Sequence, residues 1–221
     1  MDGSWTSAID IYCERLGPGF WAEPVNAISN LAFLLAAAAA FVRWRRRAHA
    51  DWPALVLIGV LTAIGIGSFL FHTYANRWSV LADVIPISIF IYVYFFFAMR
   101  RFFGLSVWAA LAVTVAFLVA SFAIDAVLPR GFLNGSGSYL PAVAAILVVG
   151  VLLLGRWPSL ARTVLLGGGI LVVSITARSI DMAVCASFPL GTHFVWHVLN
   201  GVTLYVLLVA LMASRTGRPA L

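Results

Sequence analysis

Two histidines four residues apart, His193 and His197, have the clearest capacity for chemistry in this 221-residue chain. On a helix, residues i and i+4 share a face with Cβ atoms about 6 Å apart, so both imidazoles can bind one ion. A catalytic zinc site usually takes three protein ligands and leaves a fourth position open for water. The pair therefore needs a third ligand from elsewhere in the chain.

The composition is that of a polytopic membrane protein, with 63% hydrophobic and only 10% charged residues. A helix needs about 20 apolar residues to cross a bilayer, and each backbone amide in lipid must be satisfied within its own helix or in a closed barrel. We therefore expect an all-α, seven-transmembrane helix bundle that forms one domain over residues 1–221. The expected spans are 25–42, 53–72, 79–99, 105–124, 139–155, 163–182 and 192–213.

The net charge of +6 comes from arginines that lie in short segments beside the apolar runs. This pattern is typical of the positive-inside rule and argues against a nucleic-acid partner. Ten arginines fall on one side, at positions 43, 45, 46, 47, 100, 101, 156, 162, 215 and 218, and four on the other, at 15, 77, 130 and 178. The bias predicts an N-terminus outside, a C-terminus in the cytoplasm, and a multi-pass protein of the plasma (inner) membrane. No basic segment leads into an apolar run at the N-terminus, so we expect no cleaved signal peptide.

This orientation supplies a third ligand. The second span runs outward and ends at His72, while the third and seventh spans start from the outside near Asp83 and His193. Ser68 lies one helical turn below His72 on the same face. The remaining histidine, His49, falls in the basic inner segment without a partner. The extracytoplasmic side is thus predicted to gather three histidines, an aspartate and a serine at one depth.

Such a set can hydrolyse an amide or ester. Three neutral imidazoles from His72, His193 and His197 would bind Zn²⁺ and leave a position for water, whose pKa falls to about 7. Asp83 is expected either to take the proton of that water or to hold a ligand histidine as its hydrogen-bond partner. Ser68 is expected to donate a hydrogen bond to the carbonyl or to the oxyanion formed from it.

Two other interpretations remain open. A haem can use a pair of histidines such as His72 and His197 as axial ligands, which would make the protein an electron carrier. A structural zinc site would instead suit a seven-transmembrane receptor or signalling protein.

The chain resembles the alkaline ceramidase family, within a wider group of seven-span hydrolases that includes adiponectin-type receptors. The residues that carry the resemblance run in the family's order along most of the chain: Tyr12-Cys13-Glu14, Glu23, Asn26, Ser29, Asn30, Ser68, His72, Asp83 and His193 through His197. The resemblance implies zinc on the three histidines, assisted by Ser68 and Asp83. It also implies cleavage of a ceramide-like membrane lipid to a sphingoid base and a fatty acid.

The resemblance further implies a Ca²⁺ site in the acidic segment 1–24, an extracytoplasmic lid, with Asp10, Glu14 and Glu23 as ligands. The family's aspartate is displaced to Asp10, and Leu16 stands where a polar ligand is expected. Calcium prefers six to eight oxygen ligands. The alternative is an acidic outer loop without an ion.

Two further pairs are predicted. Cys13 and Cys185 are the only cysteines, and the topology places both outside, where a disulfide can form between the lid and the segment before the last span. Two free thiols are the alternative. Arg178 and Asp181 are three residues apart near the outer end of the sixth span, a spacing that favours a mutual ion pair.

Overall fold

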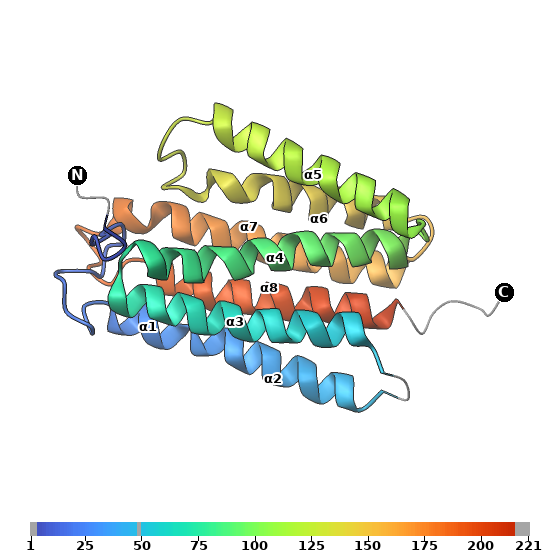
Figure 1. Cartoon of the computed structure of the whole chain (residues 1–221), viewed down its shortest axis with the longest axis horizontal. Helices are drawn as coiled ribbons and strands as arrows, with labels where there is room; N and C mark the ends of the chain where they lie inside the picture. The colour runs from blue at the N-terminus through green and yellow to red at the C-terminus, as the bar shows by residue number, and fades with distance from the viewer. Residues whose placement is uncertain (1–3, 48–49, 215–221) are drawn as a thin grey trace.

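The regular structure of this protein is helical. The computed structural model describes residues 4–47 and 50–214. In that part of the chain the only β-type pairing is an isolated antiparallel bridge between Ala8 and Asn76. The helices pack side by side as an elongated bundle (Figure 1). They are α1 (Pro24–Ser29), α2 (Leu31–Arg45), α3 (Trp52–Tyr74), α4 (Arg77–Phe102), α5 (Val107–Val127), the short 3₁₀ helix η1 (Ser136–Tyr139), α6 (Leu140–Leu153), α7 (Pro158–Val184) and α8 (His193–Ala213).

Seven helical stretches are long and apolar enough to cross a membrane, which confirms the prediction of seven such helices in an all-α protein. They contain 18 to 27 residues. At 1.5 Å per residue they reach about 27–40 Å, against a hydrocarbon core of about 30 Å. The first of them, Pro24–Arg45, is divided into α1 and α2 at Asn30.

A tight turn joins α3 to α4 and brings their site residues to the same end of the bundle. Ala75 ends α3 in the left-handed conformation, with φ 43°. Asn76 caps α4: its side-chain oxygen accepts from the Ser79 amide at 3.2 Å, and the Ser79 hydroxyl accepts from the Asn76 amide at 3.0 Å. His72 in the last turn of α3 therefore lies near the start of α4, which carries Asp83.

The backbones of α3 and α4 touch below this turn. A Cβ added to Gly67 would lie 1.9 Å from the carbonyl oxygen of Ala82 and 3.2 Å from the amide nitrogen of Asp83. Only glycine fits at such a distance. The missing side chain of Gly67 thus allows α4 to bring Asp83 beside the face of α3 that carries Ser68.

The other end of the bundle is held by a buried ion pair. Asp51 caps α3 by accepting from the Ala54 amide, and Arg101 of α4 donates two hydrogen bonds to its carboxylate, at 2.6 and 3.0 Å. Between the two ends lies an apolar core built mainly from α2, α3, α4 and α8. Its largest fully buried side chains are Phe33, Phe90, Leu57, Leu61, Ile64, Leu153, Leu208, Leu211 and Met212.

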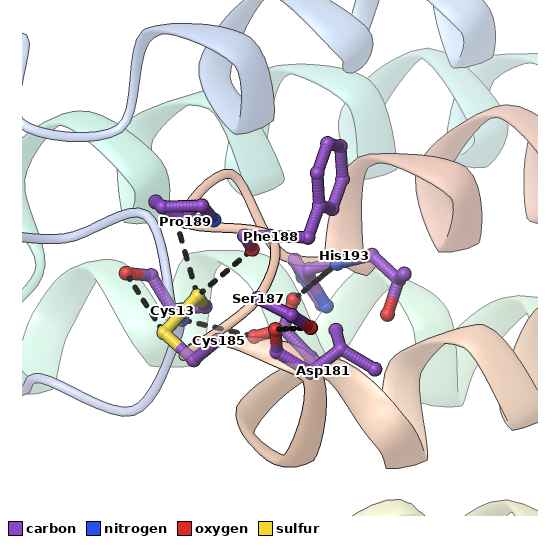
Figure 2. The surroundings of a disulfide bond; sticks show 9 residues. Cys13, Asp181, Cys185, Ser187, Phe188, Pro189 and His193 are labelled. Atoms are coloured by element: carbon purple, nitrogen blue, oxygen red, sulfur yellow. Dashed lines mark hydrogen bonds between the residues drawn. A yellow bond between two sulfur atoms is a disulfide. The ribbon is translucent and has the colours of Figure 1, made fainter.

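The described part of the N-terminal lid is fastened to the site end of the bundle. The Ile9 amide donates to the Ala75 carbonyl at 2.7 Å. Glu14 accepts from the amides of Val25 and Asn26, at 2.7 and 2.8 Å, at the beginning of α1. Cys13 forms a disulfide with Cys185 after α7, with 5.5 Å between the Cα atoms (Figure 2). The lid is therefore tied to both the first and the last third of the chain.

Candidate metal centre

Three imidazoles meet at the lid end of the bundle. His72 comes from α3, while His193 is the first residue of α8 and His197 follows one turn later. All three are buried, and their ring centroids lie 4.6 to 5.0 Å apart. One nitrogen from each ring falls within 4.8 Å of the others, and this is the only group of its kind among the described residues. The structure therefore brings together the three predicted ligands.

The hydrogen bonds of the rings decide which nitrogens can bind a metal. Burial would raise the pKa of the Glu23 carboxyl, but hydrogen bonds from His72, Arg15 and Asn26 and the charge of His72 lower it below its ordinary value. Glu23 is therefore a carboxylate, and it accepts from Nδ1 of His72 at 2.6 Å. Because Nδ1 carries the proton, Nε2 of His72 presents a free lone pair.

Ser29 has the same effect on His197. Its hydroxyl donates its one hydrogen to the Asn26 carbonyl at 2.8 Å, so it must accept from Nδ1 of His197, which lies 2.7 Å away. Nε2 of His197 is then also unprotonated. The nitrogens Nε2 of His72, Nδ1 of His193 and Nε2 of His197 are buried without a hydrogen-bond partner in the structure.

These orphaned atoms fit a metal ion. Three buried imidazole nitrogens without partners in one cluster would be costly if nothing bound them, whereas a transition metal can satisfy all three. Neutral imidazoles whose other nitrogen is held by a carboxylate or hydroxyl are the usual donors for zinc. A haem fits poorly, because its two axial histidines stand on opposite faces of the macrocycle. Here the rings of His72 and His197 are only 4.6 Å apart and His193 lies beside both.

Tyr12 of the lid covers the cluster. Its ring stacks on His193, with 3.6 Å between the centroids and 21° between the planes. Its hydroxyl accepts from Nη2 of Arg178 at 3.3 Å. Burial raises the pKa of Tyr12, in opposition to the effect of Arg178, so the phenol stays neutral. The neighbouring disulfide of Cys13 thus holds the lid residue that lies directly on a metal-ligand candidate.

Ser68 and Asp83 lie beside the histidines, as their spacing predicts. Ser68 is buried in α3 one turn below His72. The Asp83 carboxyl interacts with the Ser68 hydroxyl and lies near His72. The fourth histidine, His49, lies outside the described residues.

The predicted ion pair between Arg178 and Asp181 is wrong. Asp181 is fully buried and accepts from the backbone amides of Cys13, Thr192 and His193, at 2.9, 2.7 and 2.8 Å (Figure 2). Free amides at the start of α8 are better partners for the carboxylate than a side chain on its own helix, since they have no other acceptor. Asp181 therefore sets the position of the first residue of α8 and of the lid at once.

The predicted calcium ligands do not gather. Asp10 is exposed, whereas Glu14 is engaged by the amides at the start of α1 and Glu23 by His72 and Arg15. No carboxylate cluster suited to a metal occurs among the residues that the structure describes. The calcium prediction therefore finds no support, and Glu23 has a different role, orienting His72. Sequence spacing does not reveal that role, because the two residues are far apart in the chain.

Removing the charge of Glu23 tests this role. We expect Glu23→Gln to weaken zinc binding by about 10- to 100-fold, because the amide cannot fix the tautomer of His72 as a carboxylate does. The measurement is a zinc titration in competition with a chelator. Asp125→Asn, at an exposed carboxylate in α5, is the matched control and should retain the wild-type affinity. Equal affinities for Glu23→Gln and wild type would contradict the role.

The fold and site define a class: a seven-helix membrane protein with a buried three-histidine cluster that can hold a metal. The family model described as Ceramidase matches residues 3–219, nearly the whole chain. This protein therefore belongs to the ceramidase family. No curated protein matches the chain.

Proposed function

We propose that this protein is a zinc-dependent amidase that hydrolyses the N-acyl amide of ceramide or a related membrane lipid to a sphingoid base and a free fatty acid. Membership of the ceramidase family supports the substrate class. The observation that carries the proposal is the set of three buried imidazole nitrogens without partners, two of which have their tautomers fixed by Glu23 and Ser29.

An apolar cavity inside the bundle suits an alkyl chain of such a lipid. It is lined by residues of α3, α4, α5, η1, α6, α7 and α8, including Ile64, Phe90, Phe117, Tyr139 and Trp196. Two residues of its wall, Trp196 and Asn200, flank the ligand candidate His197 in the sequence of α8. Sites with mainly apolar walls and a few convergent polar groups are typical of small-molecule binding.

Each of the site residues has a separate role in the proposed hydrolysis. When bound, zinc would polarise the amide carbonyl and lower the pKa of a water molecule toward 7. Asp83 accepts a proton from the attacking water and passes it to the amine nitrogen as the C–N bond breaks. Ser68 donates a hydrogen bond to the carbonyl oxygen as negative charge develops there. Glu23 and Ser29 hold the imidazoles in place throughout. Water and amide are consumed, and a carboxylate and an ammonium ion are released, so that both protons of the water end on the nitrogen.

We also propose that the site end faces the extracytoplasmic side of a plasma (inner) membrane. The excess of arginines beside the opposite ends of the spans supports this orientation. The disulfide supports it independently, since Cys13 and Cys185 both lie at the site end and disulfides persist in oxidising compartments.

The direct test is ceramide cleavage by the purified protein in lipid nanodiscs. We expect equimolar release of fatty acid and sphingoid base, measured by mass spectrometry, with turnover lost on treatment with a zinc chelator and restored by zinc. A ceramide analogue with an N-alkyl amine in place of the amide is the matched control and should remain intact. A zinc-loaded protein that releases no fatty acid from any ceramide would refute the amidase and leave a receptor with a structural zinc.

A further inference from the structure

Arg178 of α7 stands at the edge of the metal centre without an acidic partner. Among the described residues, the ion pairs join other side chains, and no carboxylate lies within 4.0 Å of its guanidinium. Aromatic rings surround it instead: the guanidinium carbon lies 5.8 Å from the ring centroid of Tyr12, 5.6 Å from that of Tyr139 and 5.9 Å from that of Trp196. Cation–π contacts of this kind offset part of the cost of burying a charge, but they do not neutralise it.

Some N–H donors of the Arg178 guanidinium have no acceptor in the part of the chain that the structure describes. Arginine carries five N–H donors. Nη1 donates to the Asn134 carbonyl at 3.1 Å and to the Ser136 hydroxyl at 2.8 Å, and Nη2 donates to the Tyr12 hydroxyl at 3.3 Å. Within the described residues, Nε and the second hydrogen of Nη2 have no acceptor. Two donors of one rigid fork are therefore available to a ligand, which is the arrangement that carboxylates accept in bidentate pairs.

The charge is close to the reacting groups and to the apolar cavity. Arg178 contacts two residues next to the histidines: Tyr12, which covers them, and Trp196, which precedes His197 in α8. Through Tyr12 it is joined to the ring that stacks on His193. Tyr139 and Trp196, which pack against the guanidinium, also line the apolar cavity. A cation with free donors thus stands beside two residues of the cavity wall and, through Tyr12, beside the histidine cluster, and this combination suits an anionic head on an alkyl chain.

We propose that Arg178 binds the carboxylate of a long-chain fatty acid, with the alkyl chain in the apolar cavity. As a product site this rests on the proposed amidase, because hydrolysis of a lipid amide turns a neutral carbonyl into a carboxylate beside the metal centre. Arg178 captures that new charge with two hydrogen bonds, while Asn134, Ser136 and Tyr12 keep the fork in position. The binding itself needs no turnover and can be measured separately.

The test compares oleate with oleyl alcohol, which share the chain and differ in the head group, by isothermal titration of the zinc-loaded protein in nanodiscs. We expect the wild type to bind oleate more tightly than the alcohol. Arg178→Gln should lower the oleate affinity about tenfold or more and leave that of the alcohol unchanged, because only the carboxylate uses charge-assisted hydrogen bonds. Arg130→Gln, at an exposed arginine in the loop after α5, is the matched control and should behave like the wild type.

The zinc content of Arg178→Gln shows whether this variant is folded. If it does not fold, Ser136→Ala serves in its place: it removes one hydrogen bond that positions the guanidinium and should give a smaller loss of oleate affinity. Equal binding of oleate and alcohol by the wild type would overturn the proposal. So would an oleate preference that Arg178→Gln retains, since the metal would then be the carboxylate's partner. These binding results are independent of the amidase proposal. Oleate binding by Arg178 can fail while ceramide is still cleaved, and oleate can bind even if the protein cleaves no ceramide.

Discussion

Replacing His193 with alanine is expected to abolish zinc binding and ceramide cleavage together. The variant leaves two imidazoles, from His72 and His197, where three protein ligands are needed to hold a catalytic zinc. It also removes the ring on which Tyr12 stacks. Metal catalysis supplies several kcal/mol of transition-state stabilisation, so turnover should fall by at least about a thousandfold.

Metal analysis of the purified variant, alongside the fatty-acid release assay, checks this result. His49→Ala changes the one histidine that belongs to a basic segment of the sequence and is expected to keep both zinc and turnover. A wild-type zinc content in His193→Ala would show that the metal lies elsewhere. Loss of zinc with full turnover would separate the metal from the chemistry and refute the zinc-dependent mechanism.

Asp83→Asn is expected to lower turnover by about 10² to 10⁴ while the zinc content stays the same. This is the effect of removing a general base without changing the shape of the side chain. We expect turnover to fall without loss of zinc because other residues already hold the ligands: Glu23 binds Nδ1 of His72, and Ser29 binds Nδ1 of His197. Neither of these ligands needs Asp83 to fix its tautomer, so the carboxyl is available for the substrate water.

The rate of fatty-acid release per zinc ion is the quantity that tests this role. Asp125→Asn is again the matched control, since it makes the same change at an exposed site in α5. If Asp83→Asn lost zinc in proportion to its activity, Asp83 would be a residue that supports the ligands rather than a base.

The sequence was sufficient to predict that His72, His193 and His197 meet in one cluster, because two regularities of membrane proteins place them. Helical spacing puts His193 and His197 on one face, and the arginine bias puts the outer ends of three spans at one depth. Long apolar helices are likewise evident from composition alone. The same regularities explain why His72, Ser68 and Asp83 could be selected without knowledge of their contacts.

The supporting groups could not be predicted, because their contacts join distant parts of the chain. Glu23 lies 49 residues from His72, and Ser29 lies 168 residues from His197. Nothing in residue spacing tells which imidazole nitrogen faces which partner. Spacing was misleading for Asp181, where the local pairing with Arg178 gives way to backbone amides of the lid and of α8.

The close contact between α3 and α4 at Gly67 bears on the route by which the proposed lipid substrate reaches the site. The backbones of α3 and α4 touch at Gly67 and Ala82, and Arg101 binds Asp51 at the other end, so this pair of helices is joined near both ends. We therefore expect no lateral opening for a two-chain lipid between them. By contrast, α5 lies along the edge of the bundle (Figure 1), exposes most of its side chains and contributes Phe117 to the cavity wall. Under the proposed function, we therefore expect a substrate to enter from the bilayer on the side bordered by α5, while α3 and α4 keep the site residues in place.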